Sequence, residues 1–87
     1  MTQTVLTALQ EALTQTKARL ENYRKAEEYI LMGGASYTLS DNGIQRSVTQ
    51  ANLKWVQQGI VSLENKVKSL EAEISGSNVH RGVYRGV

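Results

Sequence analysis

Seven apolar residues in the second half of the chain recur at alternating spacings of three and four. This spacing puts their side chains on one narrow face of an α-helix, as in the seam of a coiled coil. A helix with such a seam has to bury it against another element. We therefore expect a long helix that pairs with a second helix through Leu53, Val56, Ile60, Leu63, Val67, Leu70 and Ile74.

A similar but less regular series lies between residues 4 and 32. Its inward positions are Leu6, Leu9, Leu13, Thr16, Leu20, Tyr23, Glu27 and Ile30. The series predicts a first amphipathic helix. Gly33-Gly34 ends this helix, because glycine readily adopts the left-handed conformation that closes a helix.

Between the two helices the period changes from helical to alternating. Tyr37 and Leu39 alternate with polar residues, and Asp41-Asn42-Gly43 is a strong turn signal because Asn and Gly tolerate positive φ angles. We expect a two-stranded antiparallel hairpin in residues 35–48. Ser47 or Thr49 can then cap the second helix.

These elements combine into an α+β fold in which two long antiparallel helices flank a β-hairpin, in the order α-β-β-α. Residues 1–75 form this domain, and the hairpin is expected to cap one end of the helix pair. The residues Ser75-Gly76-Ser77-Asn78 are typical of a helix end. Residues 76–87 are therefore expected to be a flexible basic and aromatic tail.

Two residues beside the second seam each allow two interpretations. Gly59 costs ~1 kcal/mol relative to Ala inside a helix, so it is either simply tolerated or allows the two helices to approach closely. Trp55 lies off the seam and near the hairpin. It either packs on a strand and completes the core, or is an exposed anchor for a partner.

The charges are unevenly placed. All eight acidic residues and eight of the ten basic ones fall within residues 1–75, and the net charge of +2 comes from Arg81 and Arg85. A neutral domain does not favour broad nucleic-acid binding, whose affinity comes mainly from neutralising phosphates.

The sequence lacks the residue patterns that are typical of catalytic, metal-binding and phosphate-binding sites. There is no cysteine, the single histidine His80 has no neighbouring acidic residue, and no phosphate-binding glycine-rich loop is present. The apolar runs are far shorter than the ~20 residues that span a bilayer. We expect no enzymatic activity, no cofactor or metal, no small-molecule substrate and no membrane insertion.

Two segments suggest protein binding instead. The first sixteen residues carry one charge, Glu11, and charge depletion is typical of interface centres, although an ordinary polar helix surface fits as well. The last residues combine Arg, Tyr and Val with Gly, which is the composition of a peptide that orders on docking, or of a dispensable terminus.

The order of these parts resembles the phage head-to-tail joining proteins typified by gpW. The likeness is carried by Gly33-Gly34, the turn Asp41-Asn42-Gly43, the opening Thr49-Gln50-Ala51-Asn52-Leu53-Lys54 of the second helix, and the ending Arg81-Gly82-Val83-Tyr84-Arg85-Gly86-Val87. Residues 34–71 carry most of it. The chain differs in its longer first helix and in a less basic segment after the second helix.

The resemblance implies a structural virion protein of a tailed phage, made in the cytoplasm of the bacterial host. In that family, copies assemble as a neck or connector ring beneath the portal of the DNA-filled head. The ring closes the head, near the channel DNA, and receives the tail. The implied partners are the portal protein and further neck and tail adaptor proteins. The copy number would follow that of the portal, about twelve.

The resemblance also assigns residues to these contacts. The C-terminal tail is disordered until assembly and is then needed for joining, a role carried over to Arg81, Val83, Tyr84, Arg85 and Val87. The charge-poor start of the first helix, together with Trp55, is the candidate contact with the portal or a neighbouring subunit. Its candidate residues are Thr4, Thr7, Gln10 and Thr14.

Two other functions remain open. A nucleic-acid-binding module would use the basic tail, although two arginines predict only weak binding with a shallow salt dependence. A regulatory helical-hairpin protein would instead pair with a host factor through its seam. We favour the structural role in a virion.

Overall fold

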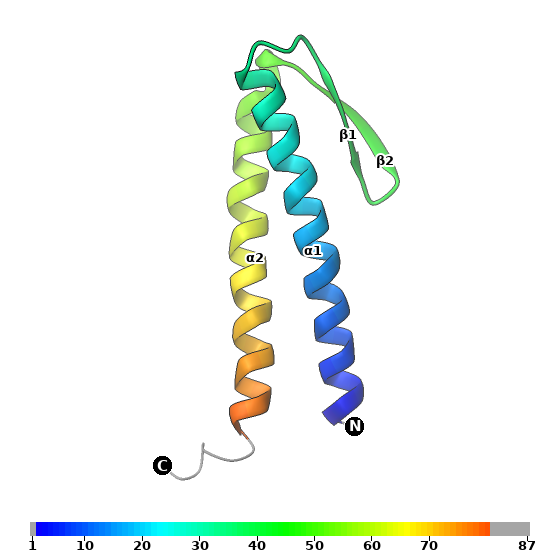
Figure 1. Cartoon of the computed structure of the whole chain (residues 1–87), viewed down its shortest axis with the longest axis vertical. Coiled ribbons are helices and arrows are strands. Elements are labelled where there is room, and N and C mark those ends of the chain that lie inside the picture. The colour runs from blue at the N-terminus through cyan, green and yellow to red at the C-terminus, as the bar shows by residue number, and fades with distance from the viewer. Residues whose placement is uncertain (1, 81–87) are drawn as a thin grey trace.

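A computed structural model describes residues 2–80 of the chain, with side-chain surroundings for residues 4–76. Its elements are helix α1 (Thr2–Leu31), strands β1 (Tyr37–Asp41) and β2 (Ile44–Val48), a short 3-10 helix η1 (Gln50–Asn52), and helix α2 (Leu53–His80). The two helices lie side by side and run antiparallel (Figure 1). The expected α-β-β-α order and α+β fold class are confirmed.

The molecule is elongated, with extents of 55 × 25 × 15 Å. We call the end where α1 stops and α2 starts the closed end, and the end where α1 starts and α2 stops the open end (Figure 1). The helices lie close together at the closed end and diverge toward the open end. The hairpin lies in the half nearer the closed end.

The C-terminus of α1 is closed by two glycines, as the sequence predicts. Gly33 has a φ of 99°, and its N–H donates to the carbonyl of Ile30 at 3.0 Å. The N–H of Gly34 donates to the carbonyl of Tyr29 at 2.9 Å. These two bonds form a Schellman motif, in which a left-handed glycine satisfies the last carbonyls of a helix.

Helix α2 begins as predicted but continues beyond its predicted end. Just before it, Thr49 caps the short helix η1, which leads into α2, and the N–H of Thr49 donates to Oδ1 of Asn52 at 2.6 Å. At the other end, the expectation that the helix stops within residues 75–78 is wrong, since it runs to His80. Ser, Gly and Asn cost at most ~1 kcal/mol each inside a helix, and an existing helix is readily extended by a turn.

Strands β1 and β2 form the expected antiparallel hairpin. Tyr37 pairs with Val48, and Asp41 pairs with Ile44 next to the turn. Asn42 and Gly43 have φ angles of 54° and 82°. Positive φ at both central residues is what a type I′ turn requires, and this turn matches the twist of the strands.

The hairpin does not cap the end of the helix pair, which corrects the expectation from sequence. It runs back beside α1 instead (Figure 1). Leu39 and Val48 are fully buried, so each strand contributes an apolar side chain to the core. Nδ2 of Asn22 on α1 also donates to the carbonyl of Ser40 at 3.5 Å. Beside α1 the hairpin buries these two apolar side chains, and Asp41 at its turn accepts hydrogen bonds from Arg19 of α1.

The hydrophobic core lies in the half of the molecule that holds the hairpin. The seven predicted inward positions of α2 are all buried or partly buried. On α1, Thr16 is buried and its hydroxyl donates to the carbonyl of Ala12 at 2.7 Å. The residues of the main core cluster are Leu20, Tyr23, Ala26, Ile30, Leu39, Val48, Leu53, Val56, Ile60 and Leu63.

Gly59 allows the two helices to approach closely. Of its two interpretations, close approach is therefore correct and simple tolerance is not. A Cβ built on Gly59 would lie 2.5 Å from Cε2 of Tyr23 on α1. Tyr23 is 6% exposed, so its ring lies directly against the backbone of α2. The glycine is present because no larger residue fits beneath that ring.

We expect Gly59→Ala to lower the free energy of unfolding by about 1 to 3 kcal/mol, because the methyl group overpacks a buried ring that cannot move aside. Gly76→Ala is the matched control. It lies in the same helix with nothing within 4 Å of an added Cβ, and should stabilise the protein by up to about 1 kcal/mol. Urea unfolding of both variants measures the difference. Equal stabilisation by the two substitutions would contradict the close contact.

Candidate protein-binding surfaces

A charged cluster attaches the turn of the hairpin to α1. Nε and Nη2 of Arg19 donate to the two carboxylate oxygens of Asp41 at 2.6 and 3.1 Å. The phenol of Tyr23 donates to Oδ2 of Asp41 at 2.9 Å. Two-pronged pairs between Arg and a carboxylate are among the strongest hydrogen-bonded pairs in proteins. This cluster is therefore structural: it fixes the hairpin and leaves no free group for chemistry.

The same contacts shift the ionisation of both acids. The hydrogen bonds from Arg19 hold the pKa of Asp41 below its ordinary value of 3.8, although burial acts in the opposite direction. Burial raises the pKa of Tyr23, and so does its hydrogen bond to Asp41. The cluster thus favours a charged Asp41 and a neutral Tyr23 across the neutral pH range.

Trp55 packs against the core, as one of its two interpretations predicts. Its ring centroid lies 5.8 Å from that of Tyr23. The guanidinium of Arg46, on strand β2, lies over the ring of Trp55, with its Cζ 5.0 Å from the ring centroid. This cation–π contact joins the hairpin to the first turns of α2. Trp55 remains partly exposed, so it contributes to the core and also reaches the surface.

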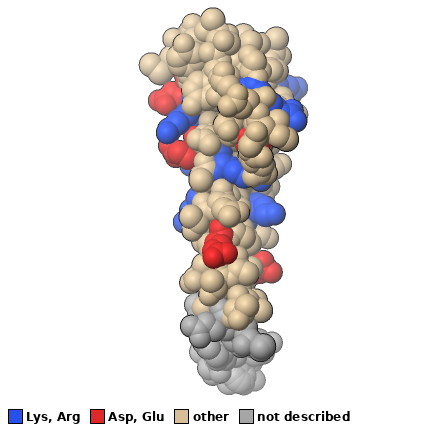
Figure 2. Space-filling model, turned by 90° about the vertical axis from the view of Figure 1, so that its right-hand side faces the viewer, with Lys and Arg blue, Asp and Glu red and all other residues tan. Residues whose placement is uncertain are grey.

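The charge-poor start of α1 forms one exposed face. Thr4, Thr7, Gln10 and Thr14 are all exposed, and their spacings of three and four bring them together on one side of the helix. The hydroxyl of Thr14 donates to the carbonyl of Gln10 at 3.1 Å. Charged side chains gather over the hairpin and the middle of the helices and thin out toward the open end (Figure 2). The structure therefore brings together these four predicted contact residues, while Trp55 lies at the closed end, far from them.

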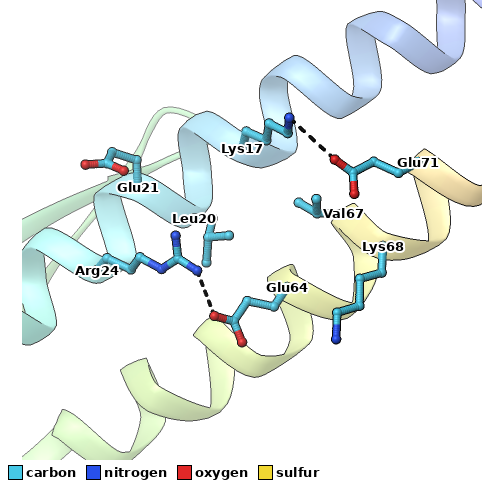
Figure 3. A pocket seen from close by; sticks show the side chains of 8 residues that line it. All are labelled: Lys17, Leu20, Glu21, Arg24, Glu64, Val67, Lys68 and Glu71. Carbon is cyan, nitrogen blue, oxygen red and sulfur yellow. Dashed lines mark hydrogen bonds and ion pairs between the residues drawn. The ribbon is translucent and has the colours of Figure 1, made fainter.

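A shallow groove between the helices is lined by charges of both signs (Figure 3). Nζ of Lys17 lies 3.5 Å from a carboxylate oxygen of Glu71, and Nη2 of Arg24 lies 2.7 Å from one of Glu64. These exposed pairs each contribute at most about 1 kcal/mol. The remaining lining residues are Leu20, Glu21, Val67 and Lys68. Two exposed ion pairs between α1 and α2 thus span the groove.

An exposed apolar cluster at the closed end was not predicted from the sequence. Leu31 is 61% exposed and Met32 is 79% exposed. Tyr29 is partly covered by its contacts with Gly34 and with the ring of Tyr37, 5.8 Å away. Both Leu31 and Met32 lie off the inward series of the first helix. Their position off that series was the sequence signal that could have predicted their exposure.

The described residues, 2–80, offer neither a group of metal ligands nor a membrane-spanning helix. Within these residues, no three His, Cys, Asp or Glu side chains lie close enough together to hold a metal ion. Neither α1 nor α2 has, in its described residues, an apolar stretch long enough to cross a membrane.

Comparison with protein families gives a match over residues 2–87 to a family of unknown function, DUF6148. The chain belongs to this family. No match is found among curated proteins or among solved structures. The match covers nearly the whole chain, and the family has no assigned function.

The predicted docking residues of the tail lie outside the described part of the chain. These residues are Arg81, Val83, Tyr84, Arg85 and Val87. The last described residue is His80, at the end of helix α2. The tail predicted to start at residue 76 is thus helical through its first five positions.

The charged cluster predicts a loss of stability in acid. Because the pKa of Asp41 is lowered on folding, its contribution is present above the ordinary value near 4 and disappears as the pH falls below it. At pH 6, Asp41→Asn should lower the free energy of unfolding by about 1 to 3 kcal/mol. The difference from the wild type should shrink toward zero between about pH 4 and pH 2. Urea unfolding at each pH measures it.

Glu64→Gln is the control for this series, since it breaks an exposed ion pair in the same molecule. It should change stability by less than about 1 kcal/mol at any pH. A loss at pH 6 as large as that of Asp41→Asn, or an Asp41→Asn difference that persists unchanged at pH 2, would refute the assigned role of Asp41.

Proposed function

We propose that this chain is a head-to-tail joining subunit of a tailed phage, a structural protein that acts by binding other proteins. The single observation that carries the proposal is the α-β-β-α fold, built from the segments that carry the resemblance to the gpW-like family. The glycine pair that ends α1 and the Asn-Gly turn of the hairpin lie in these segments. The proposal assigns the chain no catalytic role.

The arrangement of the two candidate contact segments supports a joining role. Helix α1 begins at the open end, and residues 81–87 continue from α2 at the same end (Figure 1). The charge-poor face of α1 therefore lies at the same end of the molecule as His80, after which the sequence continues with the basic and aromatic residues 81–87. The hairpin and the core lie in the other half, so the scaffold keeps its packing whatever binds at the open end.

In this proposal the partners are a portal protein and the neck or tail adaptor proteins beyond it, with copies of the chain arranged as a ring. The face formed by Thr4, Thr7, Gln10 and Thr14 contacts the portal or a neighbouring copy. Such a face loses little hydration energy when it is covered, because it carries no charge apart from the nearby Glu11. Residues 81–87 dock on the assembled neck, with Arg81, Tyr84 and Arg85 as anchors.

Deletion of residues 81–87 tests the proposed function. Because every residue of the main core cluster lies between Leu20 and Leu63, the truncated chain should keep its helical circular dichroism spectrum and unfold within about 2 °C of the full chain. It should fail to convert DNA-filled heads into tailed, infectious particles in a complementation assay. Normal particle yields with the truncated chain would contradict the role of this segment.

A matched pair of substitutions separates side-chain docking from mere length. Tyr84→Ala should reduce the particle yield, whereas Tyr84→Phe should retain most of it if the ring is the anchor. Failure of the full chain to associate with portal-bearing heads would reject the joining function itself.

A further inference from the structure

A shallow depression lies where strand β2 leads into the start of α2. Its lining residues are Arg46, Ser47, Asn52 and Trp55. Trp55 is half-buried, and the other three are exposed. Trp55 packs against the core cluster, of which the other three are not members. The polar side of the depression is therefore open to a partner.

The hydrogen-bond acceptors around Asn52 are already used within the molecule. Nδ2 of Asn52 donates to the carbonyl of Ser47 at 3.1 Å, and Oδ1 of Asn52 accepts from the N–H of Thr49 at 2.6 Å. The guanidinium of Arg46 and the indole N–H of Trp55 have no hydrogen-bond acceptor among the described residues. The depression thus offers mainly hydrogen-bond donors and one positive charge, which suits an anionic oxygen.

The guanidinium of Arg46 is held in place without being neutralised. It lies over the ring of Trp55, and a cation–π contact uses none of its N–H donors. The pKa of Asp41 is lowered mainly by the hydrogen bonds from Arg19 and to a smaller degree by the charge of Arg46. Both oxygens of Asp41 already accept from Arg19. Within residues 4–76, no acid forms an ion pair with Arg46.

The distribution of charge favours a protein carboxylate over a nucleic-acid phosphate. Residues 1–75 carry eight acidic and eight basic residues. The face that holds the hairpin shows separate basic and acidic patches and no continuous basic stripe (Figure 2), whereas nucleic-acid affinity comes from many phosphate contacts along such a stripe. Arg and Trp are instead enriched at the centres of protein interfaces, and the fork of a guanidinium matches the two oxygens of one carboxylate.

We propose that this depression binds an acidic side chain, Asp or Glu, of a partner protein. The guanidinium of Arg46 donates to the carboxylate, Asn52 supplies the remaining hydrogen of its Nδ2, and Trp55 provides the apolar contact beside them. The site lies near the closed end, away from the face around Thr7 and Gln10. This inference goes beyond the proposed function and does not depend on it.

Fluorescence of Trp55, the one tryptophan of the chain, tests the site with a short oligo-glutamate peptide at constant ionic strength. We expect saturable binding with a Kd on the order of 1 mM. Arg46→Gln should weaken it by at least about fivefold, and Arg46→Lys should restore little, because an ammonium group lacks the fork.

Lys68→Gln is the matched control for the titration. It removes the same charge from an exposed side chain in the groove between the helices, and should leave the affinity within about twofold. NMR of the wild type makes the test independent of whether a variant folds. The peptide should shift the Nε–H of Arg46 and the indole N–H of Trp55, and leave the Nε–H of Arg24 in place.

Three results would overturn the proposal. They are an absence of saturable binding up to about 10 mM peptide, equal weakening by Arg46→Gln and Lys68→Gln, and NMR shifts that leave Arg46 and Trp55 unmoved. An oligothymidylate of the same length is the second probe. If it binds more tightly than the peptide and loses affinity with Arg46→Gln, the site takes nucleic-acid phosphates and the assignment to a protein carboxylate is rejected. A chain that binds the peptide but fails to associate with portal-bearing heads leaves this inference standing.

Discussion

The ring of Tyr23 joins three parts of the molecule. The Cε2–Cδ2 side of the ring lies against the backbone of α2 at Gly59, the ring of Trp55 is 5.8 Å away, and the hydroxyl donates to Asp41 at the turn of the hairpin. A two-stranded hairpin alone is marginally stable in water. Here it is held because one buried side chain of α1 contacts both the other helix and the hairpin.

This arrangement divides the molecule into two halves with different properties. Near the closed end, the helices are in close contact and the hairpin completes a core that includes Leu39 and Val48. Toward the open end, the helices diverge and no strand covers them in the described residues. The half without the hairpin holds the charge-poor face of α1 and the end of α2 at His80.

The sequence predicted the elements well because each had a local physical signal. The seam from Leu53 to Ile74 predicted α2, and the Asn-Gly pair predicted the turn, since only a few residue types tolerate positive φ. The placement of the hairpin was not predictable in this way. It depends on Asp41 reaching Arg19, a contact between residues 22 apart, and no local pattern records such a pair. The end of α2 was missed because breaker residues weaken a helix only slightly.

The candidate surfaces were predicted less completely than the fold. Charge depletion identified the face around Thr7 and Gln10, and the structure confirms that these residues share one exposed side. Leu6 and Leu9 match the inward series of α1, and both are partly buried in the structure.

Native-state hydrogen exchange tests most directly whether the helices and the hairpin form one unit centred on Tyr23. The backbone amides of Leu39 and Arg46, which pair across the hairpin, should exchange only with global unfolding, at the same free energy as the core amides near Val56. Amides of the hairpin that exchange at unprotected rates, while the two helices remain protected, would contradict this account.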